Sequence, residues 1–455
     1  MRERATWLRA LRGALLPGVF AYLVFIRTHT ISEQFWLLGE QVRDWRIALG
    51  PLRDLPLVGT PSTAGGTTLG PVYYWVLWLI RVVLGPLGDN LPHVGGVGLS
   101  IVQSGADTFL LYVLVRRLGS VPPALAVVLL GATTPYDMAL TATVWNPPLA
   151  VALAKCAIGV VLLPGQWSLP RAALVVALAW LSVHAHTAGV FVAVACIGWM
   201  LVQPLLQRQP GRAFAAARLA IEIVLVLQVP YVVAHLAQQQ PPPAGSVLGS
   251  VRYSVDHPEE LRVAESAGAV GRILAALLLA PYSVPWAGAL LIAAGLAGLL
   301  LHRRDPAVLA VAMAPLLLAV AGFSTWRGPI QEHYWFLTLV PSAALTLLLP
   351  AATRARAGQV AAWLALAVVL VVQPARCRAA WQIHRLPEYG ALVSASRQIV
   401  RQAPEIRDIE APFLPPTSDP RFIYTILGGR VTPEATLIAH IDPQGGVVYS
   451  ASRED

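Results

Sequence analysis

ISEQFW, at residues 31–36, lies near the start of a polar stretch that runs from residue 28 to residue 92. The same stretch contains GTPS at residues 59–62 and GPVYYW at residues 70–75, so acidic, basic, aromatic and turn-forming residues are concentrated in it. A polar loop of this length is usually either functional or disordered, and the aromatic and apolar residues between its charges argue against disorder. We therefore expect an ordered stretch that carries functional groups.

The composition is that of a polytopic membrane protein. Of 455 residues, 56% are hydrophobic and only 13% are charged, whereas about a quarter of the residues in a soluble protein are charged. The formal net charge is +9, but the arginines stand mainly between apolar runs, where they orient helices. We therefore expect the protein to lie in a lipid bilayer and not to bind nucleic acid. The 3 cysteines are scattered and predict neither a disulfide framework nor a metal cluster.

Apolar runs and arginines together predict a topology, because a span needs about 20 apolar residues and because Lys and Arg collect in cytoplasmic loops. We predict an all-α membrane domain whose spans lie near residues 11–27, 95–115, 122–140, 147–163, 171–187, 188–204, 214–235, 283–301, 306–322, 333–350 and 358–373. This makes about eleven spans. With the N-terminus in the cytoplasm, every arginine-bearing turn from Arg116-Arg117 to Arg354 is cytoplasmic. The first loop (28–94) and the tail (374–455) are then on the outer, periplasmic side of a bacterial inner membrane.

Residues 71–87 are apolar enough to form a span, but counting them as one would move Arg116-Arg117 to the outer side. The aromatic residues Tyr73, Tyr74 and Trp75 favour a helix that lies at the membrane interface, where Trp and Tyr prefer to sit. Residues 268–280 have a similar character. We therefore predict an interfacial helix at residues 71–87, within the first loop, and a second one at residues 268–280.

The tail, residues 374–455, has a different composition and predicts a small α+β domain. Helical spacing of apolar residues covers 384–410, and short strands are expected at 422–427, 435–439 and 447–449 between Gly and Pro turns. About eighty residues are close to the lower limit for an independent core, so we expect the tail to lean on the membrane domain, residues 1–373.

Polar residues at the outer ends of the predicted spans are the candidate site. Ionisable groups at membrane depth are costly and favour a functional interpretation. The group comprises Asp137, Asn146, His184, His186, Arg327, His333 and Tyr334, together with Glu33 and Asp44 from the first loop.

Each of these residues also has a structural interpretation. Asn146, followed by Pro147, fits the start of a helix, and Asp107 within a span fits a hydrogen bond to a neighbouring helix. Glu33 could pair with Arg27 or His29 at the membrane surface. His184 and His186 are two residues apart, a spacing that does not place both on one helix face, so hydrogen bonding to a substrate is favoured over zinc binding.

Several motifs together resemble the C-type membrane glycosyltransferases, a superfamily that includes bacterial aminoarabinose transferases and protein O-mannosyltransferases. The motifs are a long outer loop with an early acidic residue, the GPVYYW helix, a span ending in VRRLG at residues 115–119, and HYW at residues 333–335 followed by Pro341. The resemblance covers the membrane domain in order. It implies an enzyme that transfers a sugar from a polyprenyl-phosphate carrier to an acceptor, a glycan, lipid or protein, on the outer face.

The family carries an Asp-Glu pair in its first loop, and the corresponding residues here are Ser32 and Glu33. A carboxylate beside a hydroxyl holds a divalent cation less well than two carboxylates. The cofactor is therefore left open, with a divalent metal ion as the alternative. The resemblance implies that Glu33 is the general base, with Asp44 as the second choice.

Transfer also needs cationic groups for the departing phosphate and an apolar groove for the lipid. The candidates for phosphate or sugar contacts are Arg43, Arg46, Arg81, Arg327, His184, His333 and Tyr334, and the helix that contains Tyr74 and Trp75 could line the lipid entrance. A transporter or flippase of lipid-linked or small polar substrates is the alternative function. Polar residues gathered at one face, and no sequence repeat, favour the enzyme.

Overall fold

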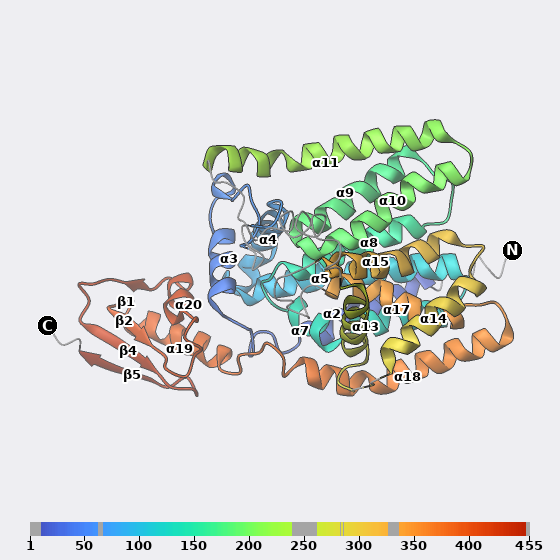
Figure 1. Ribbon diagram of the computed structural model, residues 1–455. Coiled ribbons are helices and arrows are strands. Elements are labelled where there is room, and N and C mark those ends of the chain that lie inside the picture. Colours follow the sequence, from blue (N-terminus) through green and yellow to red (C-terminus); the bar gives the residue numbers. More distant parts are fainter. Residues whose placement is uncertain are drawn as a thin grey trace.

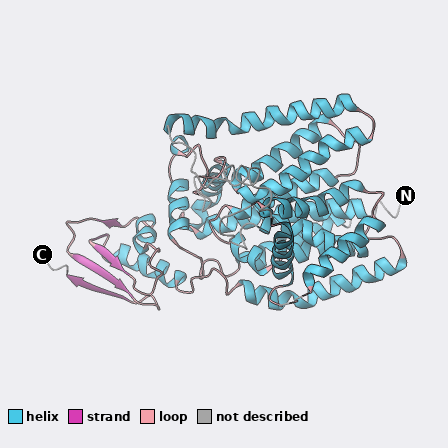
Figure 2. Cartoon of the chain, viewed as in Figure 1, coloured by secondary structure: helices cyan, strands magenta, loops and turns pink. Residues whose placement is uncertain are grey.

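The structure, a computed structural model, describes residues 11–61, 67–238, 262–282, 284, 286–325 and 336–451. Helices form most of it, and the strands are confined to the C-terminal part (Figures 1 and 2). The helices outside the first loop and the tail are α2 (Leu16–Thr28), α5 (His93–Leu118), α6 (Val121–Ala132), α7 (Pro135–Thr141), α8 (Pro147–Leu162), α9 (Leu169–Ala185), α10 (Val190–Leu206), α11 (Pro210–Gln238), α13 (Val263–Leu279), α14 (Ala287–Leu301), α15 (Pro306–Ser324), α17 (Val340–Leu348) and α18 (Arg356–Ala380).

These helices are those of a multi-pass membrane protein. Five of them in the described ranges are long and apolar enough to cross a membrane, and the number is six if a bent pair is counted as one span. Six further apolar helices are shorter. Each predicted segment overlaps an observed helix, but the segment at 122–140 is broken in two and the start of 333–350 lies outside the described residues. The total of about eleven spans stays a prediction.

Helix ends follow local signals in the sequence. Ser168 caps α9 by accepting a hydrogen bond from the Arg171 backbone amide, and Asp305 caps α15 by accepting one from Val308. The helix α5 ends at Gly119, whose φ of 72° is a left-handed conformation that favours glycine.

The segment predicted as one span at 122–140 is two helices. α6 ends at Ala132 and α7 begins at Pro135, with a bend of 63° between them. Thr134 accepts a hydrogen bond from the backbone amide of Asp137, and the following proline suits the first helical position. The Thr-Pro step therefore starts a new helix, and it turns Asp137 toward the neighbouring helices.

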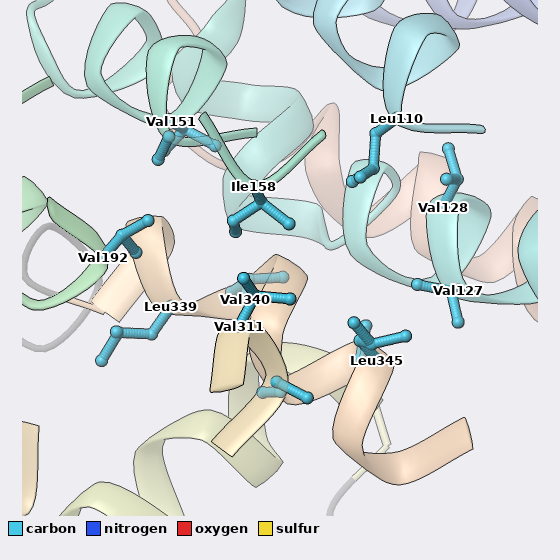
Figure 3. Packing of buried hydrophobic residues seen from close by; sticks show 14 of the residues in the cluster. Leu110, Val127, Val128, Val151, Ile158, Val192, Val311, Leu339, Val340 and Leu345 are labelled. Atoms are coloured by element: carbon cyan, nitrogen blue, oxygen red, sulfur yellow. The ribbon is translucent and has the colours of Figure 1, made fainter. Parts of the chain in front are cut away.

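The core of the helical bundle is built from aliphatic side chains. Figure 3 shows side chains from several helices pointing toward one another, among them Leu110 of α5, Val128 of α6, Ile158 of α8 and Val311 of α15. All of these side chains are buried. Packing of this kind fixes the helix positions and hence the polar groups that the helices carry.

The described residues of the first loop, 28–61 and 67–94, contain four helical segments. They are α3 (Gly39–Leu49), a 3-10 turn at Leu52–Asp54, α4 (Val72–Leu84) and a 3-10 turn at Gly85–Gly88. α4 buries Tyr73, Tyr74, Leu77 and Ile80 on one face and leaves Trp75 and other apolar side chains exposed on the opposite face. A helix with one packed face and one exposed apolar face suits the interfacial position predicted for residues 71–87.

The tail is a small α+β unit, but the prediction of a helix over all of residues 384–410 is wrong at both ends. The helix covers only Tyr389–Gln402, and the strands Glu405–Ile406 and Asp408–Glu410 follow it after Pro404, which cannot donate a helical hydrogen bond. It contains α19 (Tyr389–Gln402), β1 (Glu405–Ile406), β2 (Asp408–Glu410), α20 (Pro420–Ile426), β3 (Arg430–Val431), β4 (Leu437–Ile441) and β5 (Val447–Ala451). β1 and β3 pair in parallel, and the second sheet has the order β2-β4-β5, in which Ala439 of β4 lies opposite Tyr449 of β5.

The prediction of a strand at residues 422–427 is wrong. Their aromatic and β-branched residues favour a strand, but these residues lie in and directly after the helix α20. Asp419 accepts a hydrogen bond from the Arg421 backbone amide, and Pro420 occupies the first turn. These two residues start a helix, and burial of Phe422 and Ile423 then outweighs their β-propensity.

The first loop and the tail share one hydrophobic core, so the tail leans on the rest of the molecule. In Figure 1 the tail lies beside α3 at the end of the bundle remote from the N-terminus. The shared core contains Phe35, Trp45 and Tyr73 from the first loop, Leu99 from α5, and Tyr389 and Ile423 from the tail. The two segments are therefore on the same side of the bundle.

Candidate active site

Helix α3 holds the carboxylate of Asp44 inside the protein. Asp44 is fully buried and accepts hydrogen bonds from Arg43 Nε at 2.8 Å and from the Tyr74 hydroxyl at 3.1 Å. Its other oxygen, Oδ2, is buried without a partner in the described part of the chain. Burial raises the pKa of the Asp44 carboxyl, although the hydrogen bond and charge of Arg43 oppose the rise. A buried carboxylate in such surroundings is a candidate functional group.

Trp45 fixes the position of α3 on the membrane helices. Its indole Nε1 donates a hydrogen bond to the Asn90 carbonyl at 2.7 Å. Its ring packs so closely on α5 that a Cβ added at Gly95 would lie 2.6 Å from it. The neighbouring Asp44 is therefore held by a rigid contact rather than by a mobile loop.

Glu33 is one of the exposed carboxylates of the first loop. It follows α2, its side chain is exposed, and it has no side-chain partner among the described residues. The alternative in which it pairs with a basic neighbour is wrong for both nearby candidates. Arg27 is buried and bound to Asp107 and Asp137, and His29 Nδ1 lies 3.1 Å from the Phe25 carbonyl.

Three segments that are distant in the sequence meet beside Glu33. We call residues 381–388, between α18 and α19, the connector. The His384 ring of the connector lies 5.3 Å from Trp36 and 5.8 Å from Trp145, measured between centroids. Directly after the connector, at the start of α19, the Gly390 backbone amide donates a hydrogen bond to the Glu33 carbonyl at 3.0 Å. The first loop, the start of α8 and the connector thus form one aromatic-lined junction.

Asn146 does not cap α8 with its side chain, contrary to the simplest structural interpretation. Its Nδ2 instead donates a hydrogen bond to the Ala185 carbonyl at 2.7 Å. This bond ties the start of α8 to the end of α9. Asn146 therefore fixes the relative position of two helix ends next to Trp145.

His184 and His186 have separate partners, as their spacing predicts. His184 Nε2 lies 2.5 Å from Gln228 Oε1 on α11, and its ring is so near the first loop that a Cβ added at Gly70 would collide with it. His186 Nδ1 accepts a hydrogen bond from the Ala188 amide at 3.2 Å. In the described residues no group of three or more His, Cys, Asp or Glu side chains could hold a metal ion.

The arginines predicted to contact the phosphate differ in whether their side chains are already bound to other protein groups. Arg46 lies 3.3 Å from Asp419 and stacks over the Phe422 ring, so it binds the tail. Arg81 is half-buried, and its Nε is buried without a partner in the described part of the chain. Arg43 is paired with Asp44. Arg327, His333 and Tyr334 lie outside the described residues.

Asp137 belongs to a buried cluster of charges within the bundle. Arg27 Nη2 contacts Asp107 at 2.9 Å and Asp137 at 2.8 Å, and Lys155 Nζ contacts Asp107 at 2.7 Å and Asp137 at 3.9 Å. Gln103 also donates a hydrogen bond to Asp137. Two cations and two anions balance, which explains how all four are buried. The structural interpretation of Asp107 is confirmed.

Three buried basic residues, Lys155, Arg376 and Arg385, are not among the residues predicted from the sequence. A signal existed for Lys155, because it is an ionisable residue within an apolar run. Arg376 donates hydrogen bonds to the carbonyls of Thr133, Leu278 and Leu130. Arg385 lies in the connector and is buried. The burial of Arg385 could not be predicted from the sequence, because it depends on how distant segments of the chain pack together.

Solved structures share the fold of this chain, although their sequences differ greatly from it. In particular, the fold is similar to that of ArnT, the aminoarabinose transferase, from Cupriavidus metallidurans. The structure of ArnT bound to undecaprenyl phosphate has a TM-score of 0.56 and 14% identity, over 91% of this chain and 85% of that chain. The apo structure of ArnT has a TM-score of 0.55 and 13% identity, over 93% and 92% of the two chains.

An oligosaccharyltransferase from Archaeoglobus fulgidus is also similar, with a TM-score of 0.46 and 13% identity over 92% of this chain and 62% of that chain. No protein-family model matches the sequence, and no curated protein matches it. The likeness to ArnT is therefore a likeness of fold at low sequence identity.

Proposed function

We propose that the protein is a glycosyltransferase that moves a sugar from a polyprenyl-phosphate carrier to an acceptor on the outer face of a bacterial inner membrane. The observation that carries this proposal is the junction of Trp36, Trp145 and His384, which lies three residues along the chain from the exposed Glu33. The similarity of fold to ArnT, a structure of which holds undecaprenyl phosphate, supports it.

The proposed orientation places the N-terminus in the cytoplasm and the first loop and the tail in the periplasm. The arginine-bearing turns support this orientation, because positive charge is retained on the cytoplasmic side. The shared core of the first loop and the tail requires both to lie on one side of the membrane. An odd number of spans is consistent with a cytoplasmic N-terminus and with a tail on the same side as the first loop.

In the proposed reaction, Glu33 is the general base. The acceptor hydroxyl gives its proton to the Glu33 carboxylate while its oxygen attacks the anomeric carbon of the donor sugar. The bond between that carbon and the phosphate oxygen breaks, and the phosphate leaves on its lipid with the electron pair. A single displacement of this kind inverts the anomeric carbon. Glu33 suits the role because its carboxylate is exposed and unpaired within the described residues.

Asp44 is the second candidate for the base. It has one oxygen without a partner among the described residues, but it is buried and paired with Arg43, so a substrate would have to displace packed residues to reach it. We therefore assign Asp44 to positioning Arg43 and Tyr74. Arg43 and Arg81 are the proposed phosphate contacts of the first loop, because Arg46 is bound to the tail.

Asn146, His184 and His186 receive positioning roles in this proposal. Their side chains bind protein groups at the ends of α8 and α9. Asp137 is assigned to stabilising the bundle, since it is bound to the buried cations Arg27 and Lys155. The exposed face of α4, with Trp75, is the proposed contact with the lipid chain.

The test is to incubate the purified full-length protein with a panel of radiolabelled polyprenyl-phosphate sugars and to measure sugar transfer to an extract of envelope acceptors. The proposal predicts transfer from at least one donor with release of polyprenyl phosphate. The same protein in liposomes is tested for movement of the labelled donors between leaflets. Movement of donors without any transfer would contradict the proposal and favour a flippase.

A further inference from the structure

The connector contains a buried arginine with unused hydrogen-bond donors. Arg385 is only 8% exposed, and its Nε and Nη1 atoms are buried with no hydrogen-bond acceptor among the described residues. Arg385 also forms no ion pair with any of those residues. A guanidinium always carries its charge in a protein, so its burial requires compensation from some other group.

The other buried arginines of the chain show what such compensation is. Arg376 directs three nitrogens to three backbone carbonyls at 2.6 to 2.8 Å. Arg27 binds two carboxylates, a hydroxyl and a carbonyl at 2.8 to 3.0 Å. Both are as buried as Arg385 or more so. Arg385 is therefore an exception to the pattern that these two arginines follow.

The surroundings of Arg385 place it at the junction beside Glu33. The preceding residue, His384, has a φ of 48° and directs its ring between Trp36 and Trp145. The following residue, Leu386, is buried in the core that the first loop and the tail share. The backbone at Arg385 thus lies between His384, which contacts Trp36 and Trp145, and Gly390, whose amide binds the Glu33 carbonyl.

The charge of Arg385 persists at neutral pH. Burial lowers the pKa of the Arg385 guanidinium to about 10, still well above 7. A buried cation with unused donors binds an oxyanion strongly, because the anion supplies both the missing charge and the missing acceptors. Phosphate suits a guanidinium in particular, since its oxygens match the planar fork of donors.

We propose that Arg385 binds the phosphate group of the lipid carrier, so that the connector, and not the first loop alone, completes the phosphate site. This inference rests on the proposed function and adds a residue and a segment to it. It also assigns the tail a purpose, because docking of the tail against the first loop holds the connector in place.

The experiment measures binding, not turnover. The full-length protein in detergent is titrated with farnesyl phosphate, with farnesol and with inorganic phosphate, and binding is followed by the shift in unfolding temperature. The variants are Arg385→Gln, which removes the charge, and Arg385→Lys, which keeps the charge without the planar fork. Arg407→Gln is the matched control, because Arg407 is an exposed tail arginine without a side-chain partner among the described residues.

We expect Arg385→Gln to weaken farnesyl phosphate binding by about ten- to a hundredfold, the usual effect of losing a hydrogen bond to a charged group. Arg385→Lys should lie between this variant and the wild type, and Arg407→Gln should match the wild type. Without ligand, Arg385→Gln should unfold at the same temperature as the wild type or a higher one, because it removes an uncompensated buried charge.

Three results would overturn parts of this proposal, and they are distinguishable. Equal binding of farnesyl phosphate by the wild type and Arg385→Gln contradicts the role of Arg385 and leaves the proposed function intact. A wild type that binds no farnesyl phosphate contradicts the proposed function. Binding of inorganic phosphate through Arg385 without binding of farnesyl phosphate assigns the site to a soluble phosphate and contradicts the lipid carrier.

Discussion

Individual charged residues organise the interior of this protein by balancing one another. Arg27, Lys155, Asp107 and Asp137 come from four helices and form a neutral cluster in which each charge has an opposite neighbour. Breaking one member of a buried ion pair is strongly destabilising, because it leaves a charge without compensation. The cluster therefore fixes the relative positions of α2, α5, α7 and α8.

The first prediction concerns this cluster. Asp137→Asn leaves two cations and one anion and should lower the free energy of unfolding by about 3–5 kcal/mol. Adding Lys155→Met restores neutrality, so the double variant should recover part of the loss. Denaturant unfolding in detergent measures both. A double variant that is less stable than Asp137→Asn would contradict charge balance as the organising principle.

The second prediction concerns pH and Asp44. Because burial raises the pKa of the Asp44 carboxyl, the folded protein keeps this proton at pH values where the unfolded chain has released it. The contribution of Asp44 to stability therefore falls as pH rises above about 4, the ordinary pKa of aspartate.

Asp44→Asn removes this contribution. The unfolding temperature of the wild type relative to Asp44→Asn should decline between about pH 4 and pH 7. A series of melting curves for the two proteins across this range measures the difference. A difference that grows with pH would mean that the Arg43 ion pair outweighs burial and that the pKa of Asp44 is lowered rather than raised.

Apolar runs in the sequence predict where most helices lie, but they do not predict every position at which a helix starts or breaks. Apolar runs predict the positions of α5, α8 and α15 because membrane helices need long apolar segments. The break between α6 and α7 and the start of α20 depend on Thr134-Pro135 and Asp419-Pro420, which are capping signals hidden within apolar or β-favouring runs. Both signals are present in the sequence.

The third prediction concerns α4. Trp75 is exposed on the apolar face of this helix, whereas Tyr74 is buried and bound to Asp44. Trp75→Ala should therefore weaken the use of long polyprenyl donors more than the use of short-chain donors, because only a long chain reaches the exposed face. Comparison of kcat/KM for the two donors measures this effect.

Tyr74→Phe is the matched control for the third prediction. It removes the hydroxyl that contacts Asp44 and leaves the exposed face of α4 unchanged. It should affect long and short donors equally. If Trp75→Ala also affects them equally, the helix does not contact the lipid.

In the molecule as a whole, the tail and the first loop form one unit on one side of the membrane helices. The short length of the tail predicts that it leans on the rest of the chain, but not what it contacts. The partners are far apart in the chain: Arg46 and Asp419 are 373 positions apart, and Arg27 and Asp137 are 110 apart. Such contacts depend on how the helices pack, and composition and local spacing do not contain that information.

The fourth prediction concerns the orientation of this unit. A cysteine introduced at the exposed Gln444 of the tail should react with an impermeant maleimide in cells whose outer membrane alone has been permeabilised. This outcome follows from the arginine-bearing turns, which are expected in the cytoplasm. Labelling only after lysis of the inner membrane would reverse the orientation and remove the proposed site from the periplasm.

The proposed mechanism depends above all on a carboxylate of the first loop that activates the acceptor. The turnover of Glu33→Gln with a lipid-linked donor tests this role. The substitution keeps the size of the side chain and removes its ability to accept a proton. Turnover should fall by about two to four orders of magnitude while donor binding and folding survive.

Glu40→Gln is the matched control, since Glu40 is another exposed carboxylate of the same loop, and it should retain wild-type turnover. A large loss in Asp44→Asn together with near-wild-type turnover of Glu33→Gln would transfer the role of base to Asp44. Full turnover in both Glu33→Gln and Asp44→Asn would contradict a carboxylate base in this loop.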